Sequence, residues 1–298
     1  MKKSRILSLT AALLLSISAS CLAANIAYLG PAGTFTEEVT KKYFSATDKN
    51  TYTPGKNVND TLQMLLDGKA EYAVVPKENS IGGVVYMYYD QILGNDKFVV
   101  VQELDLPIRQ QLFSLPQAQL SDIKTVYSHP QGLAQARTWL NRNLPNAKLI
   151  ETSSTAEAVR LVEEKQDISV AGIAGPQAGE IYKVKTLAED TQITRKNVTR
   201  FLVVKLQQEE KISTNGNKAT VYLRIQAEDL LPILQNLDKN GYKLKAVHDR
   251  PAKTVIGEYN FAIEVEAQGD KGNLDSILKR AVKAGSYTVK GIYNNIAY

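Results

Sequence analysis

Apolar runs of three to five residues alternate with longer amphipathic stretches over the first two thirds of the chain. The runs have the length and composition of buried strands, and they fall at 25–29, 72–75, 125–127, 147–150, 168–171 and 201–204. The stretches between them place apolar residues three and four positions apart, as one face of a helix requires, and they fall at 37–44, 59–66, 131–141 and 154–164. Strands that alternate with helices predict an α/β fold.

The order of these elements predicts two lobes. A second unit begins near Asp105, and the strongly β-like residues around 201–204 return the chain to the first unit. We therefore expect a two-lobed, periplasmic-binding-protein-like region over 25–206, with the second lobe at about 105–190. Two crossings between α/β lobes leave a cleft where strands end and helices begin, which is where ligands bind in such layers.

The last third of the chain has a different pattern. Polar and charged residues at 207–218 predict a linker. After it, the spacing predicts a strand, a helix, two strands, a helix and a strand, at 220–226, 230–239, 243–248, 259–267, 274–284 and 287–292. This βαββαβ order is typical of an α+β ferredoxin-like domain, which we expect over 219–298.

The N-terminal residues have the pattern of an export signal. Basic residues precede an apolar stretch at 6–17, which is shorter than the ~20 residues of a membrane span, and small residues follow. We expect residues 1–24 to be a signal peptide cleaved near Ala23 or Ala24, giving a periplasmic or secreted protein without a membrane anchor. The alternatives are a retained N-terminal helix and a lipoprotein anchor through Cys21.

Charge and cysteine content reduce the number of possible functions. The formal net charge of +5 includes three basic residues of the leader, so the rest of the chain carries +2. Because this charge is small and scattered, a nucleic-acid partner is not expected. Cys21 is the one cysteine, so the exported protein would have no disulfide, thiol nucleophile or cysteine metal site. The two histidines, His129 and His248, are far apart, and no metal site is expected.

Four segments that follow or open predicted strands carry polar side chains. Thr199 offers a hydroxyl donor and Arg200 a planar fork that suits carboxylates, while Asn79 can hydrogen-bond a polar ligand. Plain loops with capping residues would look similar, so each segment alone is ambiguous. The segments are Gly30-Pro31-Ala32-Gly33-Thr34-Phe35-Thr36, Pro76-Lys77-Glu78-Asn79-Ser80-Ile81-Gly82-Gly83, Ser128-His129-Pro130-Gln131 and Thr199-Arg200-Phe201.

Together and in this order, these segments, with the last two extended to 128–135 and 197–201, resemble the successive motifs of prephenate dehydratases. Ser154-Thr155-Ala156-Glu157-Ala158 and Ala174-Gly175 fit that family in order and spacing. The region 219–298 resembles the ACT regulatory domain that follows in those enzymes, so the resemblance covers roughly residues 25–295.

The resemblance implies a carbon–oxygen lyase that converts prephenate to phenylpyruvate in phenylalanine biosynthesis, without a cofactor and as a homodimer or homotetramer. It implies catalytic roles for Thr199, Arg200 and Phe201, with Thr199 as hydrogen-bond donor to the departing hydroxyl. The substrate-binding residues that it implies are Thr34, Asn79, Ser80, His129, Gln131 and Thr155.

The sequence also departs from the family. Lys77 stands where an aliphatic residue is usual, and we expect it to point to solvent, with a contact to the substrate dianion as the alternative. Gly82 stands where an acidic residue is usual. The phenylalanine-binding signature Glu-Ser-Arg-Pro is replaced by His248-Asp249-Arg250-Pro251, so Arg250 and Pro251 remain as regulatory candidates while the response to phenylalanine is open.

Three alternatives remain for the function. Arogenate dehydratase performs the same elimination on the amino-acid analogue of prephenate, and the sequence does not decide between the two substrates. A periplasmic solute-binding protein would have the same two lobes, since a fold does not settle a function. A sensor that binds an aromatic metabolite without turnover is the third.

Overall fold

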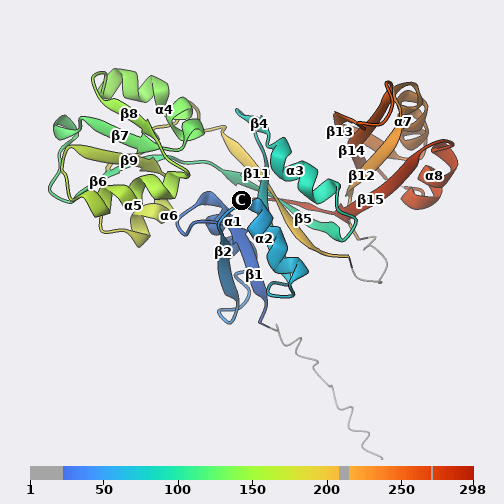
Figure 1. Ribbon diagram of the computed structural model, residues 1–298, viewed down its shortest axis with the longest axis horizontal. Coiled ribbons are helices and arrows are strands. Elements are labelled where there is room, and N and C mark those ends of the chain that lie inside the picture. Colours follow the sequence, from blue (N-terminus) through green and yellow to red (C-terminus); the bar gives the residue numbers. More distant parts are fainter. Residues whose placement is uncertain (1–22, 208–214, 270) are drawn as a thin grey trace, which may run out of the picture.

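The computed structural model describes residues 23–207, 215–269 and 271–298. Most of the predicted signal peptide (residues 1–22 of 1–24) and most of the predicted linker therefore lie outside the described residues. The described chain forms three sheets. The first sheet lies in the middle, with the second lobe and the C-terminal unit on opposite sides of it (Figure 1). No helix in these ranges is long and apolar enough to cross a membrane.

The first sheet has the strand order β16-β5-β11-β3-β1-β2, and β4 pairs with the end of β3. The strands β1, β2 and β3 run parallel, whereas β11 is antiparallel to both of its neighbours. Its elements are β1 (Asn25–Leu29), α1 (Phe35–Tyr43), β2 (Thr51–Gly55), α2 (Val58–Leu66), β3 (Tyr72–Asn79), β4 (Gly83–Val84), α3 (Tyr86–Leu93), β5 (Phe98–Pro107) and β11 (Val198–Leu206).

The second lobe is a five-stranded sheet with the order β10-β6-β9-β7-β8. The chain enters it after β5 and leaves it before β11, so it crosses between the two sheets twice. Its elements are β6 (Gln111–Ser114), a 3₁₀ turn (Leu120–Asp122), β7 (Thr125–Ser128), α4 (Pro130–Asn143), β8 (Lys148–Glu151), α5 (Thr155–Lys165), β9 (Val170–Ala174), α6 (Pro176–Ile181) and β10 (Lys185–Ala188).

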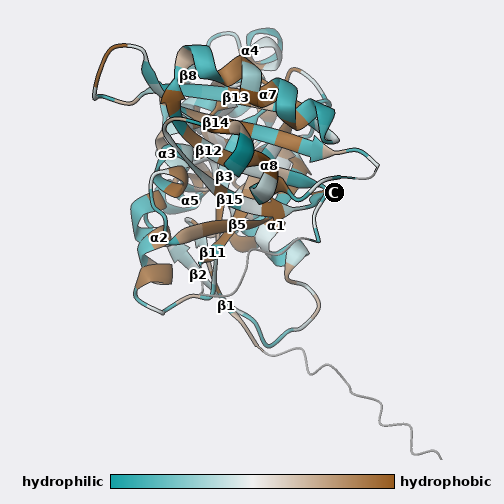
Figure 2. Cartoon of the chain, turned by 90° about the vertical axis from the view of Figure 1, so that its right-hand side faces the viewer, coloured by the Kyte–Doolittle hydropathy of each residue, from teal (hydrophilic) through white to brown (hydrophobic). Residues whose placement is uncertain are grey.

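The C-terminal unit has the predicted βαββαβ order, in an antiparallel sheet β13-β14-β12-β15. Helix α7 carries both hydrophilic and hydrophobic positions (Figure 2), and its buried residues Ile233 and Leu237 join the core of this unit. Its elements are β12 (Lys218–Gln226), a 3₁₀ turn (Ala227–Asp229), α7 (Leu230–Lys239), β13 (Tyr242–Pro251), β14 (Glu258–Ala267), α8 (Leu274–Ala281) and β15 (Ser286–Tyr293).

The last strand belongs to a different sheet from the rest of the C-terminal unit. After β15, β16 (Asn295–Ala297) pairs in parallel with β5 and becomes the edge of the first sheet. The sequence analysis did not predict this strand, because three residues are too few for a periodic pattern. The strand ties the C-terminus of the chain to the first sheet.

Candidate functional site

A cavity of about 340 Å³ lies where the first sheet meets the second lobe. Its walls come from both lobes, as the two crossings predict. The lining from the first sheet includes Thr34, Asn79, Ile108, Thr199 and Phe201, and the lining from the second lobe includes Gln110, His129, Gln131 and Thr155. This volume is at the lower end of what small-molecule sites occupy.

Four helices begin at the cavity. Their N-cap residues, which all line it, are Thr34 of α1, Asn57 of α2, His129 of α4 and Ser154 of α5. Each of these side chains accepts a hydrogen bond from a backbone N–H of its helix, at 2.9–3.3 Å. Helix N-termini attract anions through their dipoles and free N–H groups, so four of them around one cavity favour a negatively charged ligand.

The charged side chains of the lining are few. Among the described lining residues, Lys56 is the one Lys or Arg and Glu78 the one Asp or Glu. Lys56 is exposed and directly precedes the N-cap Asn57. Its ammonium group adds a positive charge at the mouth of a cavity that already attracts anions, which fits a ligand with more than one carboxylate.

Thr199 and Asn79 face each other across neighbouring strands, on β11 and β3. The Asn79 side-chain amide donates to Thr199 Oγ1 at 2.9 Å and to Asn197 Oδ1 at 2.7 Å. The side-chain oxygen of Asn79, Oδ1, accepts hydrogen bonds from the backbone N–H groups of Ile81 and Gly82, both at 2.9 Å. Asn79 is therefore fixed at both ends, and it orients the Thr199 oxygen as an acceptor. No described residue takes the hydroxyl hydrogen of Thr199, which leaves that hydrogen to donate to a ligand.

Arg200 does not line the cavity, contrary to the prediction that it pairs with a ligand carboxylate. Successive residues of a strand point to opposite faces, so Arg200 lies on the other side of β11 from Thr199 and Phe201. Its guanidinium makes two bonds to Asp105, at 2.8 and 2.9 Å, and these raise the pKa of Arg200 above its ordinary value. Its Nη1 is also 3.5 Å from Glu78 Oε2, so it offsets the negative charge of Glu78.

Ser80, which was predicted to bind the substrate, contacts the backbone of a neighbouring segment instead. Its hydroxyl accepts the N–H of Val198 at 3.0 Å and donates to the carbonyl of Lys196 at 3.4 Å. These bonds tie the loop after β3 to the segment before β11, and Ser80 does not line the cavity. Phe201, by contrast, is buried and forms part of the cavity wall.

The second lobe brings amide side chains to Asn79. Gln135 Nε2 donates to Asn79 Oδ1 at 3.4 Å, and Gln110 Nε2 donates to Gln135 Oε1 at 2.9 Å. A Cβ atom on Gly82 would lie 2.3 Å from Gln131 Nε2, so a larger residue at this position would require the end of the Gln131 side chain to move. The sequence analysis missed Gln110 and the contact of Gln135, because single glutamines in a helix or loop carry no recognisable pattern.

His129 caps α4, and its Nδ1 accepts the N–H of Gln131 at 3.3 Å. Burial lowers the pKa of His129 below its ordinary value of 6.5. The neutral imidazole therefore carries its proton on Nε2 and acts as a hydrogen-bond donor at neutral pH.

We expect His129 to make the protein less stable as the pH falls from about 7 to about 5. In this range the unfolded chain binds a proton on the histidine, near its ordinary pKa of 6.5, whereas the folded chain has the lowered pKa and resists protonation. His129→Gln should therefore flatten the curve of urea-unfolding midpoint against pH in this range. An unchanged slope in the variant would contradict the lowered pKa.

Two other side chains singled out in the sequence contact the C-terminal unit. Lys77, expected to point to solvent, is fully buried and pairs with Glu264 of β14, so that prediction is wrong. Arg250 contacts α3: its guanidinium lies 3.4 Å from the centre of the Tyr86 ring, and its Nε is 3.2 Å from Asp90 Oδ2.

Comparison with known proteins gives a consistent result. Residues 26–209 match the family model described as prephenate dehydratase. A bifunctional chorismate mutase/prephenate dehydratase of Neisseria gonorrhoeae is 34% identical over 93% of this chain and 76% of its own length. A prephenate dehydratase of Lactococcus lactis subsp. lactis is 32% identical over 84% of this chain and 89% of its own length.

A solved structure agrees with the sequence matches. The crystal structure of a prephenate dehydratase from Arthrobacter aurescens, in complex with L-Phe, superimposes with a TM-score of 0.81. It is 30% identical and covers 91% of this chain and 89% of the other chain. The similarity therefore extends over the first sheet, the second lobe and the C-terminal unit.

Proposed function

The chain belongs to the prephenate dehydratase family, and we propose that it converts prephenate to phenylpyruvate with loss of carbon dioxide and water. The observation that carries the proposal is the Asn79–Thr199 pair at 2.9 Å, inside a cavity lined by four helix N-caps. The cavity suits a dianion, and Thr199 has a hydrogen to donate to a departing oxygen.

The reaction needs three things from the site. It must hold two carboxylates, stabilise the leaving hydroxyl, and favour loss of the ring carboxylate. When that carboxylate leaves as carbon dioxide, the electron pair of the broken carbon–carbon bond enters the ring. The ring becomes aromatic and expels the hydroxyl, which takes up one proton from solvent and departs as water. Aromatisation drives the step, so a hydrogen-bond donor and correct positioning are sufficient assistance.

The described residues divide these tasks. Thr199 donates to the leaving hydroxyl, and Asn79 holds the Thr199 oxygen in place. The helix N-termini at Thr34, His129 and Thr155 hold the carboxylates, with Gln131 as a further donor. Phe201 forms an apolar wall, which disfavours a localised carboxylate charge relative to the more dispersed charge of the transition state.

The direct test is turnover by the purified protein. We expect full-length, folded protein to form phenylpyruvate from prephenate near neutral pH, followed by absorbance after alkalinisation. Arogenate in a parallel assay measures the substrate preference. Binding of prephenate without turnover would reject the enzyme and favour a solute-binding or sensing protein.

Lys56→Met is expected to raise the KM for prephenate by up to about fivefold, as the loss of one exposed charge contact does, with kcat within about twofold. A change in KM alone is the signature of uniform binding. Lys49→Met, which removes an exposed charge away from the cavity, is the matched control and should leave KM unchanged. A fall in kcat with KM unchanged would assign Lys56 a different role.

We also propose that the C-terminal unit is an ACT regulatory domain, and that the protein is an exported homodimer or homotetramer. The βαββαβ topology supports the first point. Ala24 supports a cleavage site on its N-terminal side, since its N–H donates to Asn50 Oδ1 at 2.9 Å and its carbonyl accepts from Thr51. N-terminal sequencing of the exported protein tests the cleavage site, and sedimentation analysis tests the oligomeric state. A titration of the activity with phenylalanine tests the regulatory domain, and the same titration of Arg250→Ala tests the regulatory motif that Arg250 forms with Pro251.

A further inference from the structure

Lys77 lies at an irregularity in β3, directly before the residues of the site. In the pairing of β11 with β3, Arg200 is opposite Glu78, but the next residue, Phe201, is opposite Pro76. Lys77 is therefore an extra residue in β3, as in a β-bulge. A bulge changes the face to which the following side chains point. The two residues after Lys77 end the strand with Asn79 opposite Thr199.

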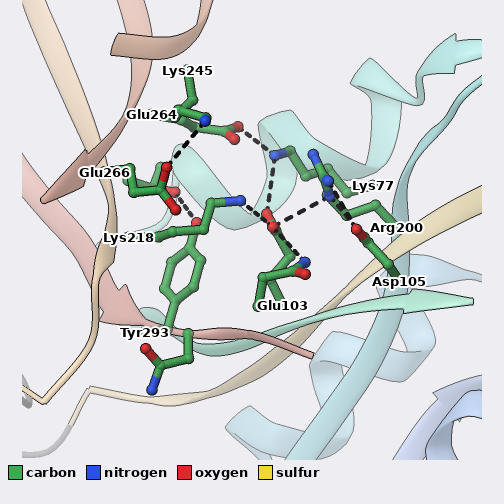
Figure 3. A network of polar contacts seen from close by, with 12 residues as sticks. Lys77, Glu103, Asp105, Arg200, Lys218, Lys245, Glu264, Glu266 and Tyr293 are labelled. Carbon is green, nitrogen blue, oxygen red and sulfur yellow. Dashed lines mark hydrogen bonds and ion pairs between the residues drawn. The ribbon is translucent and has the colours of Figure 1, made fainter. Parts of the chain in front are cut away.

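The amino group of Lys77 is held from the C-terminal unit. The side chains of Lys77 and Glu264 are 0% and 2% exposed, and they form an ion pair. Tyr89 of α3 donates to the same Glu264 oxygen at 3.0 Å, and Glu103 Oε2 lies 3.6 Å from the Lys77 nitrogen. Figure 3 shows Lys77 between Glu264 of β14 and Glu103 of β5.

This ion pair resists separation. A buried ammonium group is costly to leave without an anionic partner. The Lys77 side chain is therefore held in contact with the Glu264 carboxylate. The backbone at the bulge is fixed as well, because the Lys77 carbonyl accepts the N–H of Val85 at 2.7 Å. An aliphatic residue at this position would not tie β3 to a carboxylate of β14.

We propose that Lys77 is a positioning residue, whose pair with Glu264 holds the β3 bulge and thereby sets Asn79 against Thr199. In this chain the C-terminal unit is then part of the machinery that orders the site. The proposal rests on the proposed dehydratase function. It assigns to Lys77 an effect on kcat, because the Asn79–Thr199 geometry matters most when the hydroxyl leaves.

The test compares Lys77→Met with Lys290→Met. Lys290 is a matched control, since it is also a buried lysine between the C-terminal unit and the first sheet. Its Nζ is 3.2 Å from Asp96 Oδ1 and 3.0 Å from the Asn95 carbonyl oxygen. We expect Lys77→Met to lower kcat by about 10- to 100-fold, as small misplacements of catalytic groups do, with KM little changed. Lys290→Met should lower the melting temperature but leave the kcat of the folded protein unchanged.

A double-mutant cycle separates positioning from general damage. If Lys77 acts through Thr199, Lys77→Met should cause little further loss of kcat in a Thr199→Ala background. Wild-type kcat in folded Lys77→Met, or a full additional loss in the Thr199→Ala background, would overturn the proposal. Glu264→Gln, which keeps the side-chain shape, provides the same comparison if Lys77→Met does not fold.

A second readout does not depend on the substrate. Amide hydrogen exchange at Ile81 and Gly82, whose N–H groups bind Asn79 Oδ1, should be faster in Lys77→Met than in Lys290→Met. Equal exchange in the two variants would reject the positioning role. Failure of the wild-type protein to consume prephenate would instead reject the proposed function, while the exchange experiment still decides the role of Lys77.

Discussion

Thr199→Ala is expected to lower the kcat for prephenate by roughly 10²- to 10³-fold, the range typical for loss of one positioned hydrogen-bond donor to a developing charge. The Thr199 hydroxyl accepts from Asn79 at 2.9 Å, so the oxygen is fixed and its hydrogen can be aimed at the departing hydroxyl. Alanine removes this donor and leaves the apolar wall at Phe201 in place. Steady-state rates of phenylpyruvate formation measure the effect.

Two controls define the cause of that loss. Thr199→Ser keeps the hydroxyl and should retain most of the activity, because Asn79 can still donate to the serine oxygen. Thr199→Ala should keep KM within a few-fold, since the helix N-termini that bind the carboxylates are unchanged. Equal losses in the serine and alanine variants would show that the methyl group or the backbone at Thr199 matters, and not the hydroxyl.

The position of the site was largely predictable from the sequence. Thr34, His129 and Thr155 follow short strands and open helices, and in α/β layers such positions gather at one edge. The structure places all three around the cavity with Asn79 and Thr199. The motifs at 30–36 and 128–131 mark strand-to-helix turns, whereas those at 76–83 and 199–201 lie at the end of β3 and the start of β11.

The direction of side chains was less predictable. Thr199, Arg200 and Phe201 read as one motif, but strand alternation sends the middle residue to the opposite face. Ser80 lies in the turn after β3, and its hydroxyl is used by contacts with the segment before β11. Adjacent residues in a strand motif therefore need not share a ligand, and their roles follow only when the pairing register is known.

The environment of Lys77 depends on contacts between distant parts of the chain. Its partner Glu264 is nearly 190 residues away, and nothing near Lys77 in the sequence marks it as buried. A lysine is seldom buried unless it is paired, so solvent was the ordinary expectation. The strand β16 escaped prediction for a related cause: its pairing with β5 is set by the packing of two sheets and not by a local pattern.

Glu103→Gln is expected to lower the free energy of unfolding by about 3–5 kcal/mol, as the loss of one partner from a buried ion pair does. The Glu103 side chain is 0% exposed and pairs with Lys218 of β12. It also contacts Arg200 Nε at 3.3 Å, Asn295 Nδ2 of β16 at 2.9 Å and Lys77 Nζ at 3.6 Å. Glutamine leaves the buried Lys218 and Lys77 with one negative charge fewer between them.

Urea unfolding at neutral pH measures this effect, with Glu164→Gln as the control. Glu164 pairs with Arg160 at 2.9 Å, but its side chain is 60% exposed, so its loss should cost less than about 1 kcal/mol. Glu103 joins β5 to β12 and β16, so its substitution should weaken the contact between the C-terminal unit and the first sheet. Because each part is stabilised by this contact, the urea midpoints of both parts should fall. Similar small losses in the two variants would mean that water reaches the interface, and the buried charges would then not hold the three sheets in one arrangement.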